Sequence, residues 1–113
     1  MIEDYQFGTM TVMGRRHSQD LKIVEGEIIG RWWRKEGHSV HPEDVEDVLG
    51  VKPEFLVVGM GQPGLMQVTP ELRSALADAR VHLIELPTAQ AVETFNELLR
   101  KGRKVAGAFH LTC

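Results

Sequence analysis

The stretch that decides the fold is Phe55-Leu-Val-Val58, which runs directly into the glycine-rich segment Gly59-Met-Gly-Gln-Pro-Gly64. Four apolar residues without polar alternation are typical of a strand that is covered on both faces. Two further strand-like runs follow, at 81–86 and 104–111, and a segment of helical periodicity precedes each of them. Alternating strands and helices predict a βαβαβ unit in which right-handed crossovers make the strands parallel.

Both predicted helices of this unit begin at a proline next to a threonine. Thr69-Pro70 caps and starts the first helix, whose apolar residues recur at i, i+3, i+4 and i+7. Pro87-Thr88 leads into the second helix, which Gly102 ends after a basic last turn. In the final strand, Ala106-Gly-Ala108 leaves room for a helix or a neighbouring backbone to approach closely.

The chain before Gly50 has a different pattern, with short alternating stretches between glycines that predict antiparallel strands. Residues 21–30 read as a hairpin, because Gly26 tolerates the positive φ of a tight turn. A short helix is expected over 42–49, ended by Gly50. We therefore expect an α/β fold in which antiparallel N-terminal strands precede the βαβαβ unit and either extend its sheet or pack over it.

Composition limits the functions that are open to the chain. Its 113 residues predict one domain, over 1–113, and a net charge of −3 provides no global positive field for nucleic acid or anionic lipid. The N-terminus lacks the pattern of a signal peptide, and no apolar run approaches the length of a membrane span. The single cysteine, Cys113, excludes an internal disulfide. We expect a cytoplasmic protein that binds neither nucleic acid nor membrane.

The first candidate site is the segment 59–64, a G-x-G-x-x-G motif after a buried strand, with Glu85 placed where a carboxylate could bind a ribose. A dinucleotide site needs a helix that begins at the loop, whereas here the helix begins later, at Thr69. In addition, Pro63 has no backbone N–H to donate to a phosphate. We therefore expect no cofactor. Glycines also permit a concave site for a small polar ligand, or a loop that binds nothing. The candidate ligand-binding residues are Gly59, Met60, Gly61, Gln62 and Gly64.

The second candidate is Arg31-Trp-Trp-Arg-Lys-Glu-Gly-His38, where basic residues flank a tryptophan pair. Such a segment could clamp single-stranded nucleic acid, which Glu36 and the net charge disfavour, or anchor a protein partner. The structural alternative is that the neighbouring tryptophans point in opposite directions, one into the core and one across the surface under an arginine stem. The candidate partner surface consists of Trp32, Trp33, Arg34 and Lys35.

Histidines provide the third pattern, since His38-x-x-His41 and His110-x-x-Cys113 together offer four possible zinc ligands. We expect no metal site. His41 occupies a helix-capping position, and His110 and Cys113 would face opposite sides of a strand. A histidine acid/base, His38 or His110, beside a cleft at the 59–64 loop would make the chain a small enzyme. We expect a binding module instead, with a protein partner or a small polar ligand, and the sequence leaves the oligomeric state open.

Several segments together resemble the small Mth-type domain-of-unknown-function family over essentially the whole chain. They are Trp32-Trp-Arg-Lys-Glu-Gly-His38, Phe55 to Gly64, Pro87-Thr88 and Ala108-Phe-His-Leu-Thr-Cys113. Eukaryotic relatives in that family include an adipogenesis-associated Mth domain-containing protein and a mitochondrial complex I assembly factor. The resemblance implies a compact three-layer α/β domain without an established catalytic activity, whose better-known members act in assembly or regulation through other proteins. Met60 stands where the family's loop carries a small hydroxyl residue.

Overall fold

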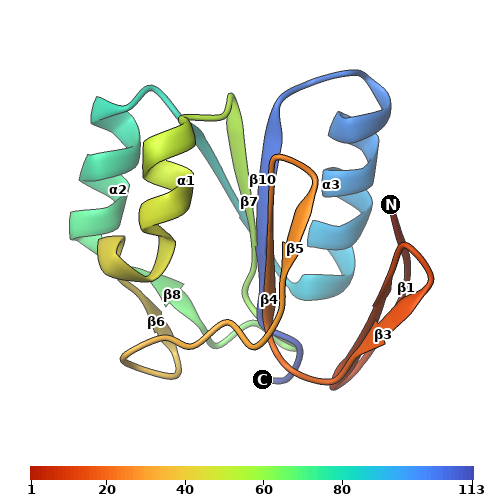
Figure 1. The fold of residues 1–113 in the computed structure, drawn as a ribbon. Coiled ribbons are helices and arrows are strands. Elements are labelled where there is room, and N and C mark those ends of the chain that lie inside the picture. Colours follow the sequence, from red (N-terminus) through yellow and green to blue (C-terminus); the bar gives the residue numbers. More distant parts are fainter.

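A five-stranded mixed sheet forms the middle layer of the computed structural model, which describes residues 1–113 (Figure 1). The strand order is β5-β4-β10-β7-β9, with β10, β7 and β9 parallel, β4 antiparallel to β10 and β5 antiparallel to β4. The strands are β4 (Leu21–Val24), β5 (Glu27–Ile29), β7 (Phe55–Gly59), β9 (His82–Leu86) and β10 (Val105–Phe109). The predicted parallel unit is confirmed.

Helices cover both faces of this sheet. One face carries the 3₁₀ helix η1 (Pro42–Val45), α1 (Glu46–Val51) and α2 (Pro70–Asp78), and the other carries α3 (Thr88–Arg100) (Figure 1). Beside α3 lies a separate antiparallel sheet of β1 (Ile2–Gln6), β2 (Thr9–Val12) and β3 (Arg15–His17). The predicted three layers are confirmed, and the N-terminal half takes both expected positions: one hairpin extends the main sheet, and three strands pack over it.

Local signals in the sequence set most element boundaries. The Thr69 hydroxyl accepts a hydrogen bond from the Leu72 amide and caps α2 as predicted. The β4–β5 turn uses Glu25 and Gly26 with φ of 52° and 76°, the two positive values that a type I′ turn requires. One boundary is wrong: Gly50 lies inside α1, which ends at Val51 and is followed by the C-cap residue Lys52 with a left-handed φ of 55°.

Proline chemistry explains that difference. Pro53 follows Lys52, and a proline disfavours helical geometry in the residue before it. The Lys52 amide still donates to the Val48 carbonyl, so the last turn closes before the chain leaves. The sequence also gave no sign of a two-stranded parallel sheet, β6 (Ser39–Val40) with β8 (Gln67–Val68), because strands of two residues carry no periodicity.

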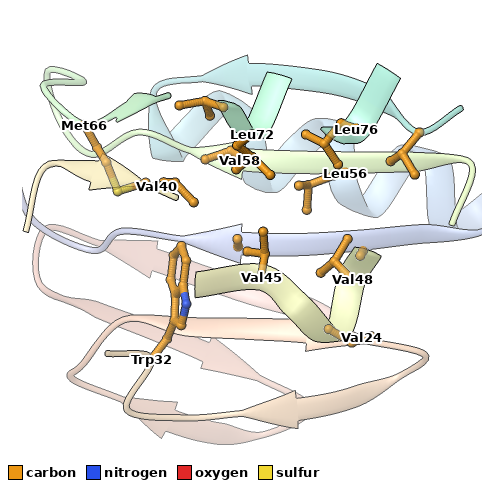
Figure 2. Close-up of a cluster of buried hydrophobic side chains, with 14 of the residues drawn as sticks. Val24, Trp32, Val40, Val45, Val48, Leu56, Val58, Met66, Leu72 and Leu76 are labelled. Atoms are coloured by element: carbon orange, nitrogen blue, oxygen red, sulfur yellow. The ribbon is translucent and has the colours of Figure 1, made fainter. Parts of the chain in front are cut away.

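Two buried apolar clusters lie on opposite faces of the main sheet. One lies under α1 and α2 and includes Trp32, Val40 and Val45 (Figure 2). The other joins the sheet to α3 and the N-terminal strands. At Gly107 of β10 a Cβ would overlap the Phe109 ring and lie 3.1 Å from the Phe95 ring of α3, so aromatic side chains occupy the space that this glycine leaves. No helix has the length and apolar character needed to cross a membrane.

Candidate functional site

The carboxyl ends of β7 and β10 bring the 59–64 loop against the last four residues of the chain. Parallel strands end at the same edge, and ligand clefts of open α/β sheets form there. Two backbone hydrogen bonds join the segments: the His110 amide donates to the Gly59 carbonyl, and the Gln62 amide donates to the Thr112 carbonyl. Directly after the loop, the Leu65 amide donates to the Cys113 carbonyl. The Tyr5 hydroxyl donates to the Leu111 carbonyl at 2.9 Å, and burial raises the pKa of Tyr5.

The amides that could form a concave anion site are already used inside the protein. The Met60 amide donates to the Leu86 carbonyl (2.8 Å), and the Gly61 amide donates to the Thr88 hydroxyl (2.9 Å). Because the Gln62 amide is also taken, none of the three is free for a ligand in this conformation. Glu85, the possible ribose carboxylate, forms an ion pair with Arg73 at 2.7 Å instead.

Gly61 supplies both a backbone conformation and the space that this junction needs. Its φ is +97°, and a Cβ there would lie 2.5 Å from the Thr112 carbonyl oxygen and 2.9 Å from the His110 ring. We expect Gly61→Ala to lower the free energy of unfolding by roughly 1–3 kcal/mol, measured by urea denaturation. The matched control is Gly50→Ala, at a helical position with nothing within 4 Å, which should leave stability unchanged or raise it. Equal effects of the two substitutions would contradict this role of Gly61.

A buried ion cluster connects the tryptophan segment to the end of β10. The Arg34 Nη1 lies 2.8 Å from the Asp20 Oδ2, and the His110 Nδ1 lies 2.7 Å from the same oxygen. The other Asp20 oxygen accepts from the Leu111 amide at 2.8 Å, and Arg34 also donates to the Gly37 carbonyl at 2.7 Å. Burial by itself would raise the pKa of Asp20, but the hydrogen bonds from His110, Leu111 and Arg34 outweigh it and lower that pKa.

Sequence reasoning missed Asp20. The residue lies in a polar loop, Ser18-Gln-Asp20, with no motif around it, and its contact with His110 spans 90 residues of sequence. Asp20 and His110 form a carboxylate–imidazole pair of the kind that orients a general base, and the His110 Nε2 is buried without a hydrogen-bond partner. Two clefts lie elsewhere, one lined by residues that include Arg15 and Arg31 and one by residues that include Val51 and Leu99, and neither is lined by Asp20, His110 or the 59–64 loop.

The two tryptophans lie in opposite environments, as expected for neighbours in extended chain. The Trp32 side chain is buried, its residue only 6% exposed, and its Nε1 donates to the Asp44 carbonyl at 2.9 Å, whereas Trp33 is 77% exposed. One detail differs from expectation: the arginine stacks on the buried ring, with the Arg34 guanidinium 4.6 Å from the Trp32 centroid. Arg34 is itself buried, so only Trp33 and Lys35 of the four candidate surface residues face solvent.

The structure does not bring the four possible zinc ligands together. His41 Nε2 pairs with Glu36, while His110 pairs with Asp20. The His38 ring packs edge-on against His110 with centroids 5.7 Å apart, and Cys113 is exposed. No group of three or more His, Cys, Asp or Glu side chains is arranged to hold a metal ion.

Comparison with known proteins gives consistent results over the whole chain. Residues 2–110 match the family described as "Protein of unknown function (DUF498/DUF598)". The solved structure of MT938 is 30% identical with a TM-score of 0.83, covering 100% of this chain and 98% of that one. A conserved hypothetical protein, PH1505 from Pyrococcus horikoshii OT3, is 27% identical with a TM-score of 0.84, covering 100% and 99%.

A more distant structure shares the fold. A Bordetella pertussis protein described as a Mth938-like domain is 20% identical with a TM-score of 0.74, covering 98% of this chain and 85% of that one. The family match spans nearly every residue, and the layers described above recur in these structures. The chain therefore belongs to the DUF498/DUF598 family, the Mth-type domains of unknown function that the sequence resembles.

Proposed function

We propose that this domain is a binding module for a protein partner, with Trp33 as its anchor. The observation that carries the proposal is the 77% exposure of a tryptophan on a segment whose neighbouring side chains are buried on both sides. Tryptophan is enriched among the few interface residues that supply most binding energy. An exposed indole in a monomer leaves a large apolar surface in water, which an apolar pocket on a partner would cover.

The segment that carries Trp33 is held in place before any partner binds. On one side, Trp32 fills the core and its amide donates to the Asp20 carbonyl at 2.8 Å. On the other side, Arg34 is fixed by Asp20 and by the Gly37 carbonyl. A pre-ordered anchor loses less conformational entropy on association than one on a mobile loop. This geometry favours recognition over a purely structural role for the second tryptophan.

Two further exposed apolar side chains lie on segments that contact the same chain end. Phe7 is 61% exposed in the β1–β2 turn, where the Gly8 amide donates to the Leu111 carbonyl. Leu65 is 55% exposed and its amide donates to the Cys113 carbonyl. The C-terminal end of the chain therefore contacts both segments. We propose that Phe7 and Leu65 contribute to the edge of a surface centred on Trp33.

The test is affinity capture from native cell extract with the wild-type chain and with Trp33→Ala. The matched control is Leu99→Ala, which truncates a 39% exposed apolar side chain on α3. We expect proteins retained by the wild type and the control to be reduced about tenfold or more by Trp33→Ala, since anchors of this kind cost at least 1.4 kcal/mol on truncation. Melting temperature should hardly change, because the side chain is exposed. Identical capture by the three chains would contradict the proposal.

We further propose a cytoplasmic location. The exposed thiol of Cys113 has no partner cysteine in the chain, which fits a reducing compartment. Carboxylate and imidazole oriented as in Asp20–His110 would also serve an acid/base reaction, but neither residue lines the cleft beside Arg15 and Arg31 or the cleft beside Val51 and Leu99, which favours binding over catalysis.

A further inference from the structure

A separate basic cleft lies between the two sheets. Its walls include β3, an edge strand of the N-terminal sheet, and β5, an edge strand of the main sheet. The volume is about 710 Å³, which lies within the 300–1,000 Å³ of typical small-molecule sites. The lining residues are Val12, Met13, Arg15, Arg16, His17, Ser18, Gln19, Ile28, Gly30 and Arg31.

The charge of this lining is of one sign, although the whole chain is acidic. It holds three arginines and a histidine and includes no carboxylate, while the net charge of the protein is −3. None of Arg15, Arg16 and Arg31 forms an ion pair within the chain. Outside the cleft, arginines 34, 73, 100 and 103 each have a carboxylate partner. Four of the eight arginines form no ion pair, and all of these but Arg80 line this one cleft.

The backbone at Arg31 supports a specific use of that side chain. Arg31 adopts a left-handed φ of 51°, a conformation that glycine or asparagine enters more easily. The chain is fixed there because the next amide, that of Trp32, donates to the Asp20 carbonyl. The Arg31 side chain therefore extends into the cleft lining from a fixed point of the backbone.

We propose that this cleft binds a small organic or inorganic anion that carries two or more oxyanion groups. Guanidinium groups present parallel N–H donors that match phosphate or carboxylate oxygens in pairs. Three such groups around one cleft fit a ligand with several negative charges, supplied either by phosphoryl groups or by carboxylates. This site is distinct from the Trp33 surface, so its test neither requires nor decides the protein partner.

The test is titration of ¹⁵N-labelled protein with pyrophosphate and, separately, with citrate at low ionic strength. We expect at least one of the two to produce saturable one-to-one shifts confined to amides of the lining, such as those of Ser18 and Gly30. Arg31→Gln should weaken that binding about tenfold, the loss of a charge-assisted hydrogen bond. Arg100→Gln, the same substitution at an exposed residue outside the cleft, should change it by less than about twofold. The anion whose titration saturates shows whether phosphoryl groups or carboxylates are the oxyanions that the cleft binds.

Several results would overturn the proposal. One is the absence of saturable shifts with either anion in a folded protein. Equal losses of anion affinity with Arg31→Gln and Arg100→Gln would show that the anion is attracted by the overall charge and not by a specific site. Binding of an acidic peptide between the two edge strands, with neither small anion bound, would assign the cleft to a macromolecule. The amide spectrum of each variant reports its folding in the same experiment.

Discussion

Replacing Trp32 by alanine is expected to lower the free energy of unfolding by about 3–5 kcal/mol. The ring belongs to the buried cluster under α1 and α2 (Figure 2). It stacks against the Arg34 guanidinium, and its Nε1 donates a hydrogen bond to the Asp44 carbonyl. Truncation leaves a cavity and removes one of the two hydrogen bonds to the Asp44 carbonyl, which also accepts from the Lys22 ammonium at 3.3 Å, in a domain whose total stability is about 5–15 kcal/mol. Urea denaturation followed by far-ultraviolet circular dichroism measures the loss.

Trp33→Ala is the matched comparison, because it removes the same side chain one residue later. We expect its free energy of unfolding to remain within about 0.5 kcal/mol of the wild-type value. Losses of similar size in the two variants would show that Trp33 also supports the fold, and would remove the main reason for assigning it to a partner surface.

Removing the carboxylate at Asp20 is expected to have the second largest effect. Asp20→Ala leaves the guanidinium of Arg34, whose side chain is 5% exposed, without its counter-charge, and it frees the Leu111 amide. Uncompensated buried charges typically cost 3–5 kcal/mol, and we expect the lower end, about 3 kcal/mol, because the Asp20 side chain keeps 17% of its surface in water. Asp20→Asn retains the shape and should lose less. An unchanged free energy of unfolding in Asp20→Ala would contradict a stabilising role for this cluster.

Acid should remove the same contribution in the wild type. Hydrogen bonds lower the folded-state pKa of Asp20 below its ordinary value of 3.8, so the unfolded chain takes up the proton first as pH falls. The stabilisation is complete above that ordinary value and disappears as pH falls through the folded-state pKa. The stability difference between wild type and Asp20→Asn should therefore stay constant down to about pH 5 and shrink as the pH falls through 3.8 and below. A constant difference would exclude the charge of Asp20 as its source.

The sequence was most informative where local chemistry decides the structure. The apolar run 55–58 predicted a strand covered on both faces, and β7 occupies the middle of the parallel strands. The threonine–proline pairs at 69–70 and 87–88 placed the starts of α2 and α3. The helix predicted over 42–49 is a 3₁₀ helix over 42–45 followed by α1, and its end was misplaced because the proline after Lys52 mattered more than the glycine at position 50.

The candidate sites were less predictable, because they depend on contacts between distant segments. Asp20 reaches His110 only because β4 and β10 are neighbours in the sheet, which no local pattern reveals. The sequence favoured opposite directions for the two tryptophans but could not say which one is buried. The basic cleft forms where edge strands of two different sheets face each other. Because the sequence does not reveal that arrangement, its arginines could not be distinguished from other surface arginines.

Photo-crosslinking from position 33 tests the central claim most directly. A photoactivatable phenylalanine analogue would replace Trp33, and in a separate chain it would replace Leu99, the exposed apolar residue on α3. Irradiation in native extract followed by electrophoresis and mass spectrometry detects proteins within reach of each position. We predict discrete adducts with one or a few proteins from position 33 and none of these from position 99. The same adducts from both positions, or none from position 33 in a folded chain, would contradict a binding surface centred on Trp33.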